Sequence, residues 1–486
     1  MLVWLVLVYL VLTILIALYA ARRVHNSKDF LIAGRSLPLY MNTATVFATW
    51  FGAETVLSVS ATFSRDGLSG IPADPFGASF SLILFGLLFA RVMYRMDLLT
   101  IGDYYRQRFG KSIEVITSLS ITLSYLGWTS AQLTALGLVF YVLSGGAISL
   151  STGILLGAGI VIFYTLFGGM WSLALTDLIQ TIVIVIGLLL IAGFVGDLAG
   201  GPSRVIEAAR TAGKLDPWPT GDAKAWIAYG AAFLTMALGS IPQQDVFQRV
   251  TSARNEKTAV RGTVLGAVAY FCFAFVPMFI AFSAIVIDPS FADLFKSEDE
   301  REIQRILPEL ILNRTPLWAQ VMFFGALLSA ILSTSSGALL APTALFTENV
   351  LRPFMPRISD RRFLMLLRTV LVLFCAGATA FALNSRSTMY QMIQQAYSVT
   401  LVGALVPLAA GVYWRRATVQ GALLSIMAGI ATWLSCLNLY GDTLVPPQLI
   451  GLAAAIAGML IGSLGPQLFT ERRPHSAHLK TDPRTS

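Results

Sequence analysis

The stretch ATWFGAETV, at residues 48–56, places Gly52 and Glu54 together inside the apolar run 38–62. A helix that crosses a membrane keeps its backbone groups paired internally. It can be interrupted only where protein or a water-filled cavity pairs those groups instead. Glycine weakens the helix at such a point, and an ionisable side chain within a span indicates a functional site by default. The stretch therefore predicts a membrane helix that is broken at a binding site.

The composition supports a membrane protein throughout the chain. Of the 486 residues, 56% are hydrophobic and 12% are charged, whereas globular chains are about 25% charged. The net charge of +8 is typical of basic cytoplasmic loops, so we expect membrane lipid and no nucleic acid as a partner. The three cysteines lie in apolar runs and the three histidines outside them, which predicts neither a disulfide framework nor a histidine metal site in the membrane.

Apolar runs of about 20 residues are long enough to cross the hydrocarbon core as helices. The expected fold class is therefore an all-α polytopic protein of the cell (inner or plasma) membrane. Thirteen such runs are found, at residues 2–21, 38–62, 74–93, 112–144, 150–168, 172–197, 223–247, 258–287, 316–349, 363–383, 389–413, 418–438 and 447–465.

The distribution of basic residues orients these spans. If the N-terminus is outside, 24 of the 34 Lys and Arg residues fall on the inside and 10 on the outside. Cytoplasmic loops contain an excess of Lys and Arg. The pattern predicts an outside N-terminus and an inside C-terminus. The polar tail at residues 467–486 is expected to be disordered.

A second interrupted span lies five spans after the first. It contains LGSIPQQDVFQRV (238–250), in which Gly239, Pro242 and Asp245 interrupt the apolar pattern. Proline removes a backbone donor and clashes with the preceding turn. Interrupted helices at matching positions of two halves are the best sequence pointer to a transporter's midplane site. Ordinary kinks are the alternative, but each break has a carboxylate beside it, which favours a site.

Three motifs resemble the sodium:solute symporter family: DFLIAGRSLP (29–38), TLFGGMWSLALTDLIQ (165–180) and SAILSTSSGALLAPTALFTEN (329–349). Within that family the resemblance is nearest to the high-affinity choline transporter-like branch. It is supported by FATWFGAE, TIGDYYRQRFGK (100–111), GSIPQQDVFQRV (239–250) and ILPELILNRTPLW (306–318). The matches are collinear from about residue 28 to residue 420.

The resemblance implies a LeuT-like fold with two inverted five-helix repeats. The implied divisions are a first extra helix (1–27), the first repeat (28–200), the second repeat (201–413), two extra helices (414–466) and the tail (467–486).

The family's sodium site implies ligands from the second and ninth spans. By motif match these are the backbone carbonyls of Ala53 and Val56, and Ala330, Ser333 and Thr334. Sodium is a hard cation that suits oxygen ligands, and a frayed helix leaves carbonyls free to coordinate it. A further acidic residue, Asp177, matches a position near the inner sodium exit path. Its alternative role is a carboxylate near a helix N-terminus.

The stretch LSTSSG (332–337) contains four consecutive hydroxyl residues. Successive helix residues are about 100° apart, so the four cannot share one face. We expect Ser333 and Thr334 to face the ion. Ser335 and Ser336 are expected to bond to the carbonyl one turn earlier or to pack against a neighbouring helix.

The predicted substrate residues are Trp50, Glu54, Trp128, Gln243, Gln395 and Tyr397. The two tryptophans match aromatics of the choline transporter branch, and tryptophan faces attract quaternary ammonium groups. Other aromatics of that box are replaced here, by Gln243 and by Ala78, and a tryptophan is absent near Ile393. A choline-like cation, a betaine and a small amino acid all remain open.

The leading hypothesis is a secondary symporter that imports a small organic solute with sodium as coupling ion. A proton-coupled transporter using Glu54 or Asp177 is the main alternative, and a transporter-derived membrane sensor is a second. An enzyme is not expected, because the chain contains no H-E-x-x-H or G-x-S-x-G motif. The solute, the stoichiometry and the oligomeric state do not follow from the sequence.

Overall fold

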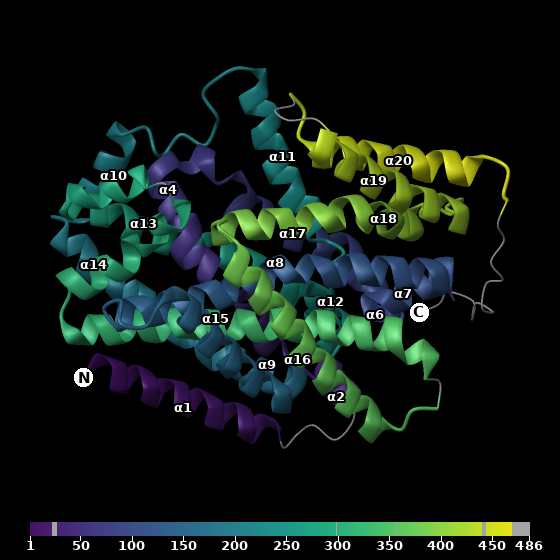
Figure 1. Cartoon of the computed structure of the whole chain (residues 1–486), viewed down its shortest axis with the longest axis horizontal. Helices are drawn as coiled ribbons and strands as arrows, with labels where there is room; N and C mark the ends of the chain where they lie inside the picture. Colours follow the sequence, from purple (N-terminus) through teal and green to yellow (C-terminus); the bar gives the residue numbers. More distant parts are fainter. Residues whose placement is uncertain (22–26, 298, 356, 440–443, 469–486) are drawn as a thin grey trace.

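The computed structural model describes residues 1–21, 27–297, 299–355, 357–439 and 444–468. These residues form an all-helical fold without a β-strand, in which α8, α15, α17 and α20 run along the longest axis (Figure 1). The α-helices, in chain order, are α1 (Leu2–Ala21), α2 (Ser27–Ile32), α3 (Leu39–Trp50), α4 (Ser60–Asp66), α5 (Ala78–Leu84), α6 (Ala90–Arg95), α7 (Ile101–Phe109), α8 (Lys111–Leu143), α9 (Leu150–Leu198), α10 (Pro202–Thr211), α11 (Ala223–Gly239), α12 (Gln244–Ser252), α13 (Glu256–Ile287), α14 (Ile306–Arg314), α15 (Leu317–Leu345), α16 (Asp360–Asn384), α17 (Met389–Gly403), α18 (Leu405–Tyr413), α19 (Val419–Leu439) and α20 (Pro447–Leu464).

Shorter helical turns connect or extend these helices. Four are π-helical: η2 (Glu54–Val59), η4 (Pro72–Gly77), η5 (Phe85–Phe89) and η8 (Phe346–Leu351). Five are 3₁₀ helices: η1 (Ala33–Arg35), η3 (Leu68–Gly70), η6 (Pro289–Lys296), η7 (Glu300–Arg305) and η9 (Arg352–Phe354). Single π-helical turns inside helices occur frequently at functional sites, and η2 directly follows the break predicted at Gly52.

Eight helices of the described residues are long and apolar enough to cross a membrane, and up to eleven are if each bent pair forms one span. The bent pairs are α3 with η2–α4 (54°), α11 with α12 (45°) and α17 with α18 (46°). The first two breaks are those predicted from Gly52 and from Gly239 with Pro242, and both are confirmed.

The third bend lies within the predicted span 389–413, where no break was predicted. α17 ends at Gly403, and Ala404 lies outside the helical region at φ −135°. Pro407, near the start of α18, has no N–H to donate to the carbonyl of Gly403. The bend therefore arises from the same glycine and proline chemistry as the second break.

The predicted spans 150–168 and 172–197 form one long helical element, α9, with a kink at Gly169. Gly169 has φ +51° and ψ −157°, which is accessible mainly to glycine. A Cβ atom there would lie 2.6 Å from the carbonyl oxygen of Phe30 in α2. The kink thus allows α2 to pack against α9. Only Gly169–Leu198 is long enough to span a membrane, and Leu150–Phe163 is a shorter apolar helix, so the total of thirteen spans stays a prediction.

Replacing Gly169 with alanine should destabilise the fold by about 2–4 kcal/mol, because alanine meets both the unfavourable backbone angles and the Phe30 carbonyl. Gly159 in the same helix is the control, since a Cβ there would have no neighbour within 4 Å. The melting temperature of the purified protein measures both variants. Equal melting temperatures for Gly169→Ala and Gly159→Ala would contradict the proposed close packing.

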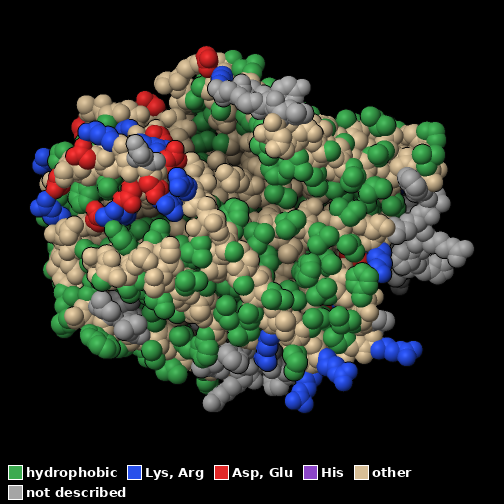
Figure 2. All heavy atoms as spheres, in the orientation of Figure 1, with side chains coloured by type: hydrophobic (Ala, Val, Ile, Leu, Met, Phe, Trp, Pro, Cys, Tyr) green, Lys and Arg blue, Asp and Glu red, His purple; other side chains and the backbone are tan. Residues whose placement is uncertain are grey.

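The two ends of the helical bundle differ from the surface between them. The start of α1, α10 and α14 lie at one end, here named the α10 end, and α6 and α7 lie toward the other, the α7 end (Figure 1). Acidic and basic side chains gather at the α10 end, while the broad surface beyond it is mostly uncharged (Figure 2). An uncharged belt is typical of a membrane-spanning protein. Which end faces outside stays a prediction.

α15 lies in the interior of the bundle, where it contacts α8, α9 and α3. The most apolar window of its span is fully buried inside the protein. A helix that is apolar all round is typically buried in this way. The hydroxyl residues of α15 therefore lie inside the protein and not against lipid.

Candidate ion and substrate sites

The first break lies directly against α15. α3 ends at Trp50, Phe51 leaves the helical conformation at ψ 79°, and helical geometry resumes at Ala53. A Cβ atom on Gly52 would lie 2.8 Å from Oγ1 of Thr334 in α15. Only glycine permits this close approach. The break and the hydroxyl row of α15, 280 residues apart in sequence, are thus neighbours.

The second break lies against α17. α11 ends at Gly239, and Gln243 occupies the position before α12 in an extended conformation. A Cβ atom on Gly239 would lie 2.3 Å from the carbonyl oxygen of Tyr397. The bend therefore brings Gln243 to the side of α17 that contains Tyr397.

Three aromatic rings from three different helices converge beside these breaks. The ring centroids of Trp50 and Tyr397 lie 5.9 Å apart and nearly parallel, and those of Trp50 and Trp128 lie 6.2 Å apart. Trp128 and Tyr397 close the triangle at 6.3 Å. All three side chains are at least 96% buried. We name Trp50, Trp128 and Tyr397 the aromatic cluster.

Two glutamines connect the aromatic cluster to the breaks. Gln243 donates from Nε2 to Oγ of Ser124, one turn before Trp128 on α8, at 3.1 Å. Gln132, one turn after Trp128, donates from Nε2 to Oε2 of Glu54 at 2.6 Å. Residues four apart lie on one helix face. Glu54 and Gln243 therefore lie on opposite sides of Trp128 along this face.

Three polar atoms around the cluster are buried and have no hydrogen-bond partner among the described residues: Nε1 of Trp50, Nε1 of Trp128 and Oε1 of Gln243. A buried indole N–H usually finds a partner, and an unpaired buried polar atom is costly. The site thus offers two hydrogen-bond donors and one acceptor.

Two predicted ion ligands of α15, Ser333 and Thr334, contact Ala48 of α3, and Ser333 also contacts Asp177 of α9, the residue predicted on the sodium exit path. Thr334 donates from Oγ1 to the carbonyl of Ala48 at 3.1 Å, and Ser333 lies 3.4 Å from the same oxygen. Ser333 also donates to a carboxylate oxygen of Asp177, whose Oδ2 has no hydrogen-bond partner in the described part of the chain. The side chains of all three are buried. This set of hydroxyl, carbonyl and carboxylate oxygens fits a hard cation such as sodium.

The other predicted ion ligands lie close to this set. Ala53, Val56 and Ala330 are fully buried. Ala53 directly follows Gly52, which packs on Thr334. The carbonyl of Val56 accepts a hydrogen bond from the hydroxyl of Ser60. The hydroxyls of α15 thus contact the second span at Ala48, before the break. The assignment of Ala53, Val56 and Ala330 as sodium ligands stays a prediction.

The prediction that Ser335 and Ser336 bond to the carbonyl one turn earlier is confirmed. Ser335 donates to the carbonyl of Ile331, and Ser336 donates to that of Leu332 at 2.8 Å. Both therefore bond within α15. Ser333 and Thr334, the first half of the hydroxyl row, bond outside α15.

The structure does not bring Gln395 to the aromatic cluster. Gln395 is exposed, whereas Tyr397 is buried. Two residues are about 200° apart around a helix, so the two side chains leave α17 on opposite sides. Gln395 therefore does not line the space around the aromatic cluster.

Sequence reasoning missed several residues that contact the sites. Tyr125 stacks on Trp128 with centroids 5.7 Å apart and donates to the carboxylate of Asp245. Ala48 and Gln132 contact predicted residues directly. An unbroken apolar helix gives no signal for such contacts. The sequence signal that could have indicated Gln132 is its position as a polar residue one turn after Trp128 in an apolar helix.

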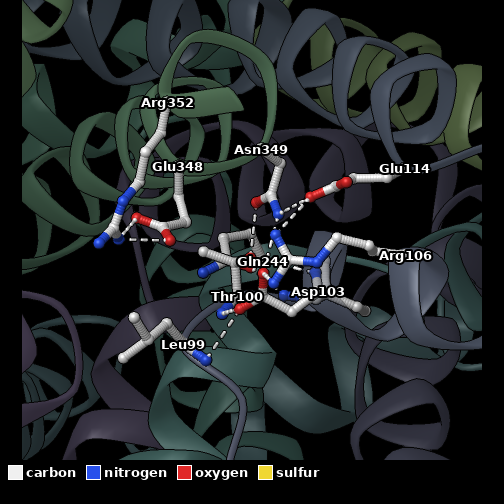
Figure 3. A network of polar contacts seen from close by, with 10 residues as sticks. Leu99, Thr100, Asp103, Arg106, Glu114, Gln244, Glu348, Asn349 and Arg352 are labelled. Carbon is white, nitrogen blue, oxygen red and sulfur yellow. Dashed lines mark hydrogen bonds and ion pairs between the residues drawn. The ribbon is translucent and has the colours of Figure 1, made fainter. Parts of the chain in front are cut away.

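A partly buried polar network lies at the α7 end of the bundle (Figure 3). Asn349 of η8 donates to Glu114 at 2.7 Å and to Asp103 at 3.1 Å, and it accepts from Thr100 at 2.6 Å. Arg106 forms ion pairs with the same two carboxylates, at 3.2 Å and 2.8 Å. The network joins α7, α8 and the turn that follows α15.

The same network extends to the second break. Oε1 of Gln244, the first residue of α12, accepts from the backbone N–H of Ile101 at 2.8 Å. Figure 3 shows Gln244 beside Thr100 and Asp103. α12 is thereby anchored at the α7 end.

Replacing Asn349 with alanine should cost about 3 kcal/mol or more, because the buried Thr100 hydroxyl loses its acceptor and the carboxylates of Asp103 and Glu114 lose a shared amide donor, which leaves their charge to Arg106. Thermal unfolding of the purified protein measures this loss. Asn384→Ala is the matched control, since Asn384 is exposed and bonds only to its own helix at Ala380. A melting temperature equal to that of the control would show that the network adds no stability.

Comparison with known proteins identifies the family. The model of the sodium:solute symporter family matches residues 30–429. The chain is 26% identical to high-affinity choline transporter 1 of Caenorhabditis elegans, over 87% of this chain and 75% of the relative. It is 26% identical to the human high affinity choline transporter 1, with the same coverage, and 24% identical to the human sodium/iodide cotransporter, over 93% and 73%.

Solved structures confirm the expected LeuT-like transporter fold. A Na+-coupled sialic acid symporter in a substrate-bound outward-open state matches with a TM-score of 0.81 at 20% identity, over 96% of this chain and 97% of that one. Mhp1, a nucleobase-cation-symport-1 family transporter, matches with a TM-score of 0.59 at 15% identity, over 92% and 98%. The chain therefore belongs to the sodium:solute symporter family, as a multi-pass plasma-membrane transporter that is not an enzyme and has sodium as its coupling ion.

Proposed function

We propose that this symporter imports a small organic cation or zwitterion, such as choline, a betaine or an amino acid, by alternating access. The observation that carries the proposal is the convergence of Trp50, Trp128 and Tyr397 beside both helix breaks. The faces of such rings attract ammonium groups through cation–π contacts. The relatives named as choline transporters support the same class of solute.

The polar atoms around the cluster support a solute with more than an ammonium group. The indole N–H groups of Trp50 and Trp128 are free donors, and Oε1 of Gln243 is a free acceptor. A hydroxyl or carboxylate on the solute would accept from the indoles. Glu54, bonded to Gln132 one turn from Trp128, adds a carboxylate that favours positive charge on the ligand.

The contacts between the rings support a moving site. The ring centroids of the aromatic cluster lie about 6 Å apart. An ammonium group could therefore enter between the rings only if α3 moved away from α8 and α17. The break at Gly52 allows α3 and α4 to move separately. We propose thirteen spans in which residues 28–200 and 201–413 form the inverted repeats that rock against each other.

Sodium would bind between these repeats. We propose that Ser333, Thr334 and Asp177 bind it together with carbonyls of the second span, at Ala48 or at Ala53 and Val56, and with Ala330. Because Gly52 packs against Thr334, sodium would hold α3 on α15. Trp50, two residues before Gly52, would thereby be held in the position that binds the solute. Sodium binding and solute binding would be coupled in this way.

Uptake into proteoliposomes tests the proposal. Labelled choline, glycine betaine and a neutral amino acid are offered with an inward sodium gradient, and again with potassium replacing sodium. We expect uptake of at least one solute to fall about tenfold or more without sodium. A separate arm imposes an inward proton gradient at fixed sodium. Uptake that follows protons and ignores sodium would favour the proton-coupled alternative, and uptake of none of these solutes would contradict the proposed solute class.

A further inference from the structure

Arg249 is a buried arginine whose guanidinium makes one long hydrogen bond among the described residues. Its side chain is 1% exposed and is among the largest fully buried side chains. Nη1 reaches the carbonyl of Asp245 at a long 3.5 Å, and Nε and Nη2 have no partner among the described residues. A guanidinium group has five donors, and burying it is costly unless its charge is compensated.

Two buried carboxylates supply the compensating charge. Arg249 interacts electrostatically with both Asp177 of α9 and Asp245 of α12. Asp177 accepts a hydrogen bond from the hydroxyl of Ser333, and Asp245 accepts one from the hydroxyl of Tyr125. The Oδ2 of each carboxylate has no hydrogen-bond partner within the described ranges. When both carboxylates are ionised, Arg249 is the one cation that they share among the described residues, and one buried negative charge has no counter-charge there.

The missing charge is the charge of one sodium ion. Asp177 is bonded to Ser333, which belongs to the proposed ion site. A sodium ion there would balance Asp177 and leave Arg249 to Asp245. Without sodium, Arg249 alone would have to serve both carboxylates, since unpaired buried charges are strongly unfavourable.

The guanidinium of Arg249 lies beside the ion site at a place where α15 has a glycine and therefore no side chain. A Cβ atom on Gly337 would lie 2.5 Å from Nη2 of Arg249. Gly337 is four residues after Ser333, so both lie on one face of α15. Gln248, next to Arg249, and Gln180, one turn after Asp177, are buried side-chain amides. Neither amide has a hydrogen-bond partner among the residues that the structure describes. The guanidinium therefore lies on the helix face of Ser333, among buried polar groups.

We propose that Arg249 is a tethered counter-cation of the ion site, which pairs with Asp177 when sodium is absent and with Asp245 when sodium is bound. It is a positioning residue, and the inference rests on the proposed sodium coupling. Because Asp245 accepts from Tyr125, which stacks on Trp128, the same movement links the ion site to the aromatic cluster.

The first test measures sodium binding without transport. Sodium is titrated against purified protein, and the shift in melting temperature or tryptophan fluorescence gives the apparent sodium affinity. Gly337→Ala displaces the guanidinium without changing any charge. Removing this competitor should tighten the apparent sodium affinity about 3- to 10-fold. Gly325→Ala in the same helix, where a Cβ would have no neighbour within 4 Å, should leave it unchanged.

The second test separates net uptake from exchange. Exchange of labelled for unlabelled solute, with sodium on both sides, never requires the empty transporter to reorient, whereas net uptake does. Arg249→Gln should lower net uptake tenfold or more and largely retain exchange, and Arg249→Lys should restore much of the net uptake. A merely structural role would lower both rates together.

Several outcomes would overturn the inference. An unchanged or weaker sodium affinity in folded Gly337→Ala would do so, as would parallel loss of exchange and net uptake in folded Arg249→Lys. These outcomes, with a normal sodium response in the wild type, would leave the proposed function intact. Absence of any sodium response in the wild type would instead overturn the proposed sodium coupling and the inference with it.

Discussion

Replacing Ser333 and Thr334 together with alanine is expected to raise the sodium concentration for half-maximal uptake about 10- to 100-fold. The change removes two oxygens that point from α15 toward α3 and Asp177. Asp177 also loses its hydroxyl donor, so its buried carboxylate becomes less well paired. Sodium-dependent uptake in proteoliposomes measures the effect, and the sodium-induced melting shift of purified protein confirms that binding has changed.

The neighbouring hydroxyls provide a matched control for this experiment. Ser335→Ala with Ser336→Ala removes two hydroxyls from the same helix, but both donate to carbonyls of α15 itself. We expect the sodium requirement of this variant to change less than about twofold. If both double variants raised the requirement equally, a general loosening of α15 would explain the result and the ion site would lie elsewhere.

Much of the fold was predictable because a membrane imposes a simple rule on the sequence. Apolar runs located the long helices, and glycine, proline and carboxylates located the breaks at Gly52 and Gly239. The bend at Gly403 was missed although Pro407 supplied the same signal. The kink at Gly169 was not predictable, because its backbone angles depend on the close approach of Phe30, far away in sequence.

The sites were predictable only to the level of helix faces. Periodicity separated Ser333 and Thr334 from Ser335 and Ser336, because that separation depends on one helix alone. The same periodicity separates Gln395 from Tyr397, which lie on different faces of α17. The contact of α15 with Ala48 depends on how two helices are placed along each other. No local pattern encodes that placement.

The burial of Arg249 is a second feature that no local sequence pattern predicts. An arginine near the end of a predicted span is expected to extend its charge toward the membrane surface. Instead α12 is a short helix after a bend, and it directs Arg249 into the protein toward two carboxylates from different helices. Only the assembled structure shows that these three charges belong together.

Replacing Trp128 with alanine is expected to raise the KM for the solute about 10- to 100-fold and to leave sodium binding to the solute-free protein nearly unchanged. Trp128 contributes one face of the aromatic cluster and an unpaired indole N–H. Loss of a desolvated cation–π contact costs about 2 kcal/mol, and loss of a hydrogen bond adds to it. Concentration-dependent uptake at saturating sodium measures KM, and the sodium-induced melting shift measures ion binding.

Two further variants separate the contributions of Trp128. Trp128→Phe retains an aromatic face without the indole N–H, so its KM should lie between those of the wild type and Trp128→Ala. Trp226→Ala is the control, because Trp226 is an exposed tryptophan of α11 outside the cluster, and its KM should be unchanged. If Trp128→Ala raised the sodium requirement as strongly as the solute KM, Trp128 would act through the ion site. If neither changed in folded protein, the solute would bind outside the aromatic cluster.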